Sequence, residues 1–301
     1  YGTSILYSNF TITNNRIISN GTAIFVNDID GIQIYNNTIQ SVIGISVFDS
    51  KKIHIFENDI LVSRTGIGVS NSEGNVTNNL IQGECYNDKC DVVYFTKVAQ
   101  SGIKIVSLSD IHAKDNIIES FNILVNSTNS AINLRENYLD YSNTGIHIKG
   151  GMSSEIHGNK ISNSSTLINS IDSQNIEIYD NNFSNFGKAY FSTNSTSNLL
   201  TNYYDEGQVC LEFIDSIYNV ANFDNFDCTE AFLYEKFNLN VNILTDDQVP
   251  SPNHQFYYYN EFNLDKEYSQ TNTDGLSNYL TLTTIKVDNS GLNINFNNYY
   301  F

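Results

Sequence analysis

The sequence predicts an all-β chain that folds as a right-handed, single-stranded parallel β-helix of about nine coils, followed by a cap and a small C-terminal β-rich region. Two observations support this fold class. An asparagine recurs every 21–22 residues along the first two thirds of the 301-residue chain. Around each of these asparagines apolar and polar residues alternate, which is the period of a strand and not of a helix. A repeat of this length holds only short strands and turns.

The recurring asparagine is expected at a sharp turn between two strands of each coil. Asparagine tolerates the left-handed backbone conformation and bonds to nearby backbone groups. Repeated at one position, its side-chain amides predict an internal ladder, in which each coil donates to one neighbour and accepts from the other. One interval is 37 residues long and marks an insertion. The ladder asparagines are Asn15, Asn37, Asn58, Asn79, Asn116, Asn137, Asn159, Asn181 and Asn202.

Apolar residues flank each ladder asparagine at fixed distances. A second apolar strand follows in several repeats, as in GISV (44–47) and GIHI (145–148). One coil cannot bury these residues alone, but coils stacked ~4.8 Å apart place them in continuous interior columns. Three residues before the asparagines stand Ile12, Ile34, Ile55, Val76, Ala113, Leu134, Ile156, Ile178 and Leu199.

The regular period predicts three regions. The β-helix spans residues 1–204 and carries an insertion loop at 82–101. Residues 205–236 are expected to cap its last coil, with a short helix at 229–237. Residues 237–301 form an aromatic-rich β region with the signature of a hairpin near its end.

The chain begins inside a coil, because residues 2–8 align with residues 21–27. The end of a β-helix exposes apolar core and an unpaired strand edge. We therefore expect either upstream sequence or a partner to cover that end, and the aromatic-rich tail of a second copy is a candidate partner.

The charge of the chain excludes several partners. It carries 15 Lys+Arg against 33 Asp+Glu, a net charge of −18, so that it repels phosphate backbones and anionic membrane faces. No apolar run reaches the ~18 residues that a membrane span needs. His and Cys do not occur at metal-ligand spacing, and nucleotide-binding motifs are absent. We expect no nucleic-acid partner, no membrane span, no metal and no cofactor.

The four cysteines form two local pairs, Cys85 with Cys90 and Cys210 with Cys228, which we interpret as disulfides of an extracellular or cell-surface protein. The first pair would close the base of the insertion loop. Sequons of the form Asn-x-Ser/Thr are candidates for glycosylation, although chance alone produces as many in a chain so rich in these residues. They lie at Asn9, Asn20, Asn36, Asn75, Asn126, Asn163, Asn182 and Asn194.

Over residues 1–204 the repeat resembles the parallel β-helix repeat that pectate lyases, polygalacturonases, viral tailspikes and many surface proteins share. The following segment is similar to the closing segment of the surface-protein and sugar-binding branch, which reads Asn-Tyr-Trp-Gly, Ile-Tyr-Asp and Pro-Phe-Leu. Here the chain has Asn202-Tyr203-Tyr204, Ile217-Tyr218-Asn219 and Ala231-Phe232-Leu233, so the Trp, Gly and Pro are replaced. The resemblance implies the fold and leaves the function open.

Enzymes with this repeat carry their catalytic residues on outward positions of one sheet. Outward positions before the ladder asparagines hold one dense ionisable cluster. Glu155 and Glu177, one coil apart, are the candidate acid/base pair for a glycosidic bond, and Arg135 or Lys114 would hold a uronate. The alternative is a solvated charged face, in which His157 and Arg135 offset the carboxylates.

Enzyme signatures are missing around this cluster. The polygalacturonase-like motif Asn272-Thr273-Asp274-Gly275 lies in the tail without its companion motifs, and the calcium-binding and catalytic residues of pectate lyases cannot be mapped. Outward aromatic residues offer a binding alternative, because Tyr35 and Phe56 are neighbours in adjacent coils and form a platform for a sugar ring.

We therefore expect an extracellular structural or adhesive β-helix that associates with copies of itself, as a segment of a surface layer, filament or adhesin, with glycans as further candidate partners. A polysaccharide lyase, glycoside hydrolase or epimerase is one alternative, and a viral tailspike or fibre is the other. The residues favour a protein that is not an enzyme.

Overall fold

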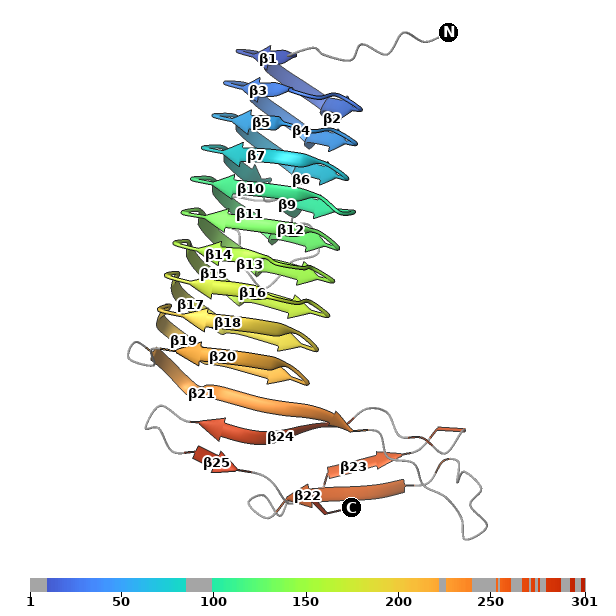
Figure 1. Ribbon diagram of the computed structural model, residues 1–301, viewed down its shortest axis with the longest axis vertical. Coiled ribbons are helices and arrows are strands. Elements are labelled where there is room, and N and C mark those ends of the chain that lie inside the picture. The colour runs from blue at the N-terminus through green and yellow to red at the C-terminus, as the bar shows by residue number, and fades with distance from the viewer. Residues whose placement is uncertain are drawn as a thin grey trace.

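The computed structural model describes residues 10–84, 99–221 and 226–239, together with short stretches of the tail. The sequon at Asn9 and most of the insertion loop lie outside the described residues. The coils stack into one elongated column (Figure 1), and the predicted parallel β-helix is confirmed. The described stretches of the tail are 253, 255–260, 267–270, 272–273, 276, 280–287, 293–295 and 299–300.

Each coil contributes one short and one long strand, and the two kinds form separate sheets. The short-strand sheet has 10 strands, each parallel to the strand of the next coil. Its strands are β1 (Thr11–Thr13), β3 (Gln33–Tyr35), β5 (Ile53–Phe56), β7 (Glu73–Thr77), β10 (Asp110–Lys114), β12 (Ala131–Arg135), β14 (Glu155–His157), β16 (Ile176–Tyr179), β18 (Thr196–Leu200) and β20 (Ile217–Ala221).

The long-strand sheet covers the opposite side of each coil and has 13 strands. The insertion divides one long strand into β8 and β9, which both pair with β6 and with β11. Its strands are β2 (Arg16–Asn27), β4 (Thr38–Phe48), β6 (Asp59–Ser70), β8 (Leu80–Gly83), β9 (Ala99–Val106), β11 (Ile117–Thr128), β13 (Tyr138–Lys149), β15 (Lys160–Ile171), β17 (Asn182–Thr193), β19 (Tyr203–Ile214), β21 (Phe226–Leu239), β24 (Leu280–Val287) and β25 (Asn293–Asn295).

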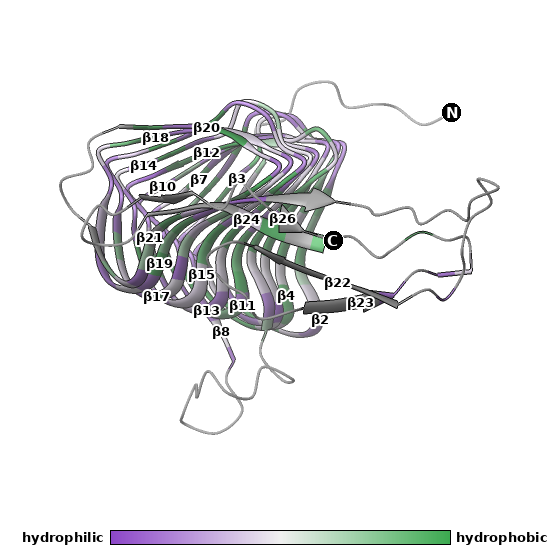
Figure 2. Cartoon of the chain, turned by 90° about the horizontal axis from the view of Figure 1, so that it is seen from below, coloured by the Kyte–Doolittle hydropathy of each residue, from purple (hydrophilic) through white to green (hydrophobic). Residues whose placement is uncertain are grey.

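The core of the column is built from the predicted apolar columns, and stripes of equal hydropathy run from coil to coil in Figure 2. Ile34, Ile55 and Val76 stand opposite one another in consecutive coils and are at most 1% exposed. Burying such a side chain stabilises a fold by about 1.5–3 kcal/mol relative to leaving it exposed. Stacking therefore buries apolar residues that a single coil would leave in water.

The repeated asparagines form a hydrogen-bonded ladder inside the coils. In all eight steps the Nδ2 of one asparagine donates to the Oδ1 of the next, over 2.9–3.0 Å. The same Oδ1 accepts the backbone N–H of the preceding ladder asparagine. The step from Asn79 to Asn116 crosses 37 residues of sequence, so the insertion leaves the ladder intact.

The left-handed turn residue lies one position earlier than we predicted. The residue before each ladder asparagine has a φ of 52–66°, and the ladder asparagines themselves do not have positive φ. The corner is made by Asn36 in one coil and by Glu136 in another. The ladder asparagine that follows it is buried, and its amide lies inside the coil. The prediction that the ladder asparagine itself adopts this conformation is therefore wrong.

A second internal ladder, which the sequence reasoning missed, occupies the turn from each long strand into the next short strand. A serine hydroxyl there accepts a backbone N–H of the preceding coil over 2.9–3.3 Å and donates to a carbonyl of its own turn. The ladder is interrupted at Gly151, where a Cβ would lie 2.7 Å from the side chain of Ile148. Its members are Ser50, Ser72, Ser109, Ser130, Ser173, Ser195 and Ser216.

The described part of the predicted cap, residues 205–221 and 226–236, continues the sheets of the β-helix. The short helix predicted at 229–237 is wrong, because β21 is a strand that pairs in parallel with β19. Pairing with the preceding coil here overrides local helix propensity. The strand ladder thus crosses the predicted boundary at 204, while the division into three folding regions stays a prediction.

One strand of the tail pairs with the last coil. β24 lies antiparallel to β21 and also pairs antiparallel with β25, as the hairpin signature predicts. Leu280 and Leu282 on β24 are buried. A separate small sheet contains β22 (Gln255–Asn260), β23 (Glu267–Gln270) and β26 (Tyr299–Tyr300).

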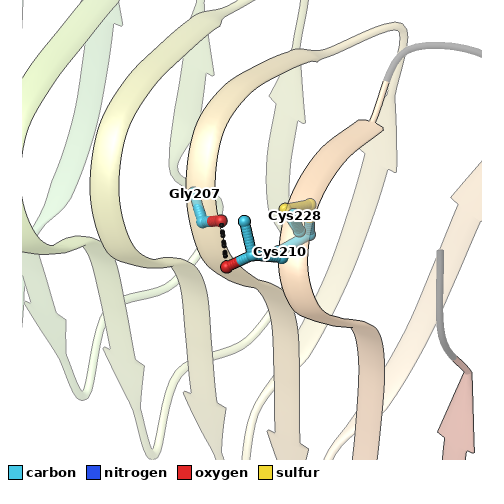
Figure 3. Close-up of a disulfide and its surroundings, with 4 residues drawn as sticks. Gly207, Cys210 and Cys228 are labelled. Carbon is cyan, nitrogen blue, oxygen red and sulfur yellow. Dashed lines mark hydrogen bonds between the residues drawn. A yellow bond between two sulfur atoms is a disulfide. The ribbon is translucent and has the colours of Figure 1, made fainter.

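A disulfide between Cys210 and Cys228 joins the last two long strands, β19 and β21 (Figure 3). Both cysteines are fully buried, and their Cα atoms are 5.8 Å apart. Beside the disulfide, the hydroxyl of Thr229 donates to the carbonyl of Gly207 over 3.2 Å. A covalent link therefore holds the last coil, where both hydrogen-bonded ladders have ended.

The two predicted disulfides have different outcomes. The pairing of Cys210 with Cys228 is confirmed. Both Cys85 and Cys90 fall in the insertion loop, outside the described residues. The disulfide between Cys85 and Cys90, with its role at the base of the loop, therefore stays a prediction.

Candidate functional site

The outward face of the short-strand sheet carries two side-chain columns. Residues two and four positions before each ladder asparagine stand in register from coil to coil, as the 21–22-residue spacing predicts. Glu155 stands opposite Glu177, and His157 stands opposite Tyr179. The columns bring side chains from distant parts of the sequence within contact of one another, which is the arrangement that a binding or catalytic site requires.

Glu155 is the centre of the ionisable cluster. The Nδ2 of Asn133, one coil earlier, donates to Glu155 Oε2 over 2.7 Å, and the hydroxyl of Tyr179, one coil later, donates to Glu155 Oε1. His157 Nε2 lies 3.9 Å from Oε1. The hydrogen bond to Glu155 raises the pKa of Tyr179 to about 12, so the phenol keeps its proton and its role as donor.

The other predicted members of the ionisable cluster, Lys114, Arg135 and Glu177, make no side-chain hydrogen bond or ion pair with Glu155. Lys114 Nζ lies 3.1 Å and Arg135 Nε 3.3 Å from the carboxylate of Glu136. Glu136 is the left-handed turn residue before a ladder asparagine. Its hydrogen bond with Lys114 lowers the pKa of Glu136 and raises that of Lys114. Glu177 is exposed, and its side chain makes no hydrogen bond or ion pair within the described part of the chain.

This geometry differs from that of an acid/base pair. A general acid or base needs an oxygen within reach of the substrate proton, whereas each oxygen of Glu155 already accepts a hydrogen bond from a neighbouring coil. The predicted carboxylate pair is adjacent in register, but only one member has side-chain partners. The cluster is chemically a hydrogen-bonded brace between three coils.

Stacked rings occupy the same outward column at two places. Tyr35 and Phe56 have centroids 4.7 Å apart and an interplanar angle of 9°. His157 and Tyr179 have centroids 4.8 Å apart and an angle of 7°. In both pairs the rings belong to adjacent coils, so their separation matches the ~4.8 Å spacing of strands.

The ends of the first ring pair are bordered by small residues. Register places Thr13 beside Tyr35 and Thr77 beside Phe56, and neither threonine is large enough to cover a ring. Gln33 and His54 stand two residues from these rings on the same outward face, both exposed. The arrangement combines apolar ring surface with hydrogen-bonding groups.

No family model matches the sequence, and no curated protein matches it. Among solved structures the chain is similar to PfbA, a surface adhesin of Streptococcus pneumoniae, at 12% identity and a TM-score of 0.51, over 91% of this chain and 84% of that one. The chain is a parallel β-helix. Two phage tailspikes are less similar. The tailspike of Pseudomonas phage phi297 has 11% identity and a TM-score of 0.41, over 87% of this chain and 60% of that one. The tailspike of E. coli bacteriophage HK620, in complex with a pentasaccharide, has 9% identity and a TM-score of 0.37, over 91% of this chain and 74% of that one.

Similarity at this level of identity shows the fold alone. Within the residues that the structure describes, no group of three or more His, Cys, Asp or Glu is placed to hold a metal ion. The same residues include no helix long and apolar enough to cross a membrane. The function of this β-helix must therefore be argued from its outward side chains.

A groove in this β-helix lies where the long strands bend, away from the predicted cluster. Tyr141, Asn163, Asn185 and Glu206 line it and recur every 21–22 residues, each with a positive φ. The only signal in the sequence was this spacing, because the four positions hold three different residue types. Asn163 and Ser162 both donate to the buried carboxylate of Asp140, so hydrogen bonds within the chain occupy part of the groove wall.

The described sequons differ in exposure. Asn20, Asn36, Asn182 and Asn194 are exposed, whereas Asn75, Asn126 and Asn163 are partly buried. Glycosylation stays a prediction, and the exposed four are the positions where a glycan meets the least steric hindrance.

Proposed function

We propose that this β-helix is an extracellular adhesive protein that binds carbohydrate on the outward face of its short-strand sheet, at Tyr35 and Phe56, without cleaving it. The observation that carries the proposal is the stacked pair of rings on the outward face, with the smaller Thr13 and Thr77 in register on either side. A sugar ring offers an apolar C–H face and polar hydroxyls, and aromatic rings beside amide and imidazole groups complement both.

Binding without turnover follows from the state of the ionisable cluster. Both oxygens of Glu155 are engaged by Asn133 and Tyr179, and the two cations of the cluster are paired with Glu136. Cleavage of a glycosidic bond by this mechanism needs two carboxyl groups that both reach the bond, and in this cluster Glu177 alone has no side-chain partner among the described residues. The proposal therefore assigns this cluster a structural role.

An extracellular location is supported by the buried Cys210–Cys228 disulfide, since such bonds persist in oxidising compartments. The similarity to a surface adhesin is compatible with it. Self-association in a layer or filament stays a prediction. Phe10, Ile18 and Phe25 are 51%, 65% and 66% exposed and supply apolar surface for contact between copies. Sedimentation of the protein over a concentration series tests whether it self-associates.

The proposal is tested by measuring the binding of an oligosaccharide panel to the protein and to the double variant Tyr35→Ala/Phe56→Ala. We expect the affinity of the double variant for an oligosaccharide that the wild-type protein binds to fall about tenfold or more, because each contact with an aromatic ring contributes roughly 0.5–1.5 kcal/mol. The matched control is Phe25→Ala/Phe48→Ala, which removes a second aromatic pair, 5.6 Å between centroids, from the long-strand sheet. Equal affinity in all three proteins would contradict the proposal, as would equal losses in both variants.

A further inference from the structure

An outward column of the long-strand sheet has a composition unlike the rest of the chain. Lys104, Asn126, His147 and Asn169 stand opposite one another in four consecutive coils. Lys149 lies two residues beyond His147 on the same strand and stands opposite Thr128. We name Lys104, Asn126, His147, Lys149 and Asn169 the basic column.

The basic column is positive within a chain of net charge −18. Neither Asp nor Glu occurs in β9 or in the second halves of the next three long strands, 122–128, 143–149 and 165–171. An anion approaching this face meets two ammonium groups and no carboxylate within these strands. The formal charge on these strands is therefore opposite in sign to the net charge of the whole molecule.

The side chains of the basic column have unused hydrogen-bonding capacity. Lys104 and Lys149 are exposed and make no ion pair within the described residues, unlike Lys114, Lys188 and Lys236, which are all paired with carboxylates.

The two asparagines of the column point their amide nitrogens outward. The Oδ1 atoms of Asn126 and Asn169 are buried and accept no hydrogen bond from the described residues. An asparagine whose carbonyl oxygen is turned inward presents its NH₂ group on the other side of the side chain. Asn126 and Asn169 thus flank His147 with donors on both sides.

We propose that the basic column binds an anionic group, a sulfate or a carboxylate, carried by a polymeric ligand such as an acidic polysaccharide. Lys104 and Lys149 supply charge, and the outward amides and the imidazole supply directed donors. The two lysines lie two coils apart and are offset by two residues along the strand, or roughly 12 Å at strand spacing, a distance over which two flexible side chains can reach one group above Asn126 and His147. This site is separate from the aromatic face and does not rest on the function proposed there.

His147 makes this binding dependent on pH. Burial lowers the pKa of His147, and the charge of Lys149 lowers it further. The strands packed on either side face it with Asn126 and Thr128, and with Asn169 and Ile171, none of which titrates. An anion beside the imidazole favours its charged form and raises its pKa in the complex, so we expect affinity to increase as the pH falls.

The experiment is calorimetric titration of the full chain at low salt with a sulfated oligosaccharide, a uronate oligosaccharide of equal length and a neutral one. We expect one anionic ligand or both to bind, the neutral one to fail, and Lys104→Gln/Lys149→Gln to weaken binding tenfold or more. Lys51→Gln/Lys52→Gln, on an exposed turn, changes net charge equally and should leave affinity within about twofold.

Preference between the sulfated and the uronate ligand identifies the source of the anion. The Tyr35→Ala/Phe56→Ala protein should still bind the anionic ligand. A failure of the proposed adhesive function can therefore be distinguished from a failure of the anion site. The assignment would be overturned if neither anionic ligand binds, or if the two lysine variants lose affinity equally. A circular dichroism melt checks that each variant is folded.

Discussion

The inner turn and the outer face of the same short strand obey opposite rules. The ladder asparagine is the same residue in nine coils and, from Asn37 to Asn202, is buried. The positions two and four residues earlier hold seven and five residue types in the same nine coils. Repetition is required inward, because each amide must match the one above and below it. Outward, no neighbour imposes a residue type. The difference teaches that stability here is encoded in the periodic positions and ligand recognition in the aperiodic ones.

The two inner turns also differ from each other. A ladder asparagine accepts two hydrogen bonds from the preceding coil and donates to the following one and to a carbonyl. A ladder serine accepts one hydrogen bond from the preceding coil and donates within its own turn. The asparagine turn thus binds consecutive coils more strongly than the serine turn does.

Removing one amide from the middle of the asparagine ladder should have the largest effect. Asn137→Ala deprives the backbone N–H and the Nδ2 of Asn116 of an acceptor, and each buried donor left without a partner costs about 1–3 kcal/mol. We expect the free energy of unfolding to fall by about 3–5 kcal/mol in a denaturant titration. Asn15→Ala, at the exposed first step, is the control. A loss as large at Asn15 as at Asn137 would contradict the ladder account.

Opening the disulfide should have the next largest effect. Cys210→Ser leaves the last coil without its covalent link across a sequence separation of 18, and closing a loop of that size stabilises by roughly 3 kcal/mol. We expect a lower midpoint of thermal unfolding, with the same shift in wild-type protein treated with reductant. A variant as stable as wild type would show that the strand pairing of β21 suffices.

A serine substitution should have a smaller effect than the asparagine substitution. Ser130→Ala removes one acceptor for the backbone N–H of Ser109, so we expect a loss of about 1–2 kcal/mol in the same titration. Ser130→Thr retains the hydroxyl and separates the hydrogen bond from the change in volume. If Ser130→Ala destabilises the protein more than Asn137→Ala does, the ranking of the two turns is wrong.

The smallest effect concerns an outward brace at the end of the column. Glu212 contacts Lys188 over 2.6 Å and Lys236 over 2.7 Å. Burial raises the pKa of Glu212, but the hydrogen bonds and charges of the two lysines outweigh it, and the net pKa lies below the ordinary 4.5. This contribution to stability is present above pH 4.5 and is lost as the pH falls through the lowered pKa. Glu212→Gln should therefore melt with a weaker dependence on acid pH than wild type, and an identical dependence would contradict the assignment.

The sequence was sufficient to predict what repeats and insufficient for what does not. One residue type at a constant interval predicted the fold, the register of the outward columns and the neighbours Tyr35 and Phe56. The serine ladder was missed because Ser is common throughout the chain, and its signal is the Asp-Ser or Asn-Ser pair at most of these turns, as at Asp49-Ser50 and Asn129-Ser130. The pairing of Lys114 and Arg135 with Glu136 was unpredictable, because it depends on where a turn directs one side chain.

The central claim, that the outward face binds carbohydrate and does not cleave it, is tested most directly by product analysis. The protein is incubated with each oligosaccharide that it retains, and the mass of the recovered ligand is measured by mass spectrometry. The account predicts intact ligand, with equal binding by Glu155→Gln. Shortened products that disappear in Glu155→Gln or Glu177→Gln would contradict it and establish an enzyme.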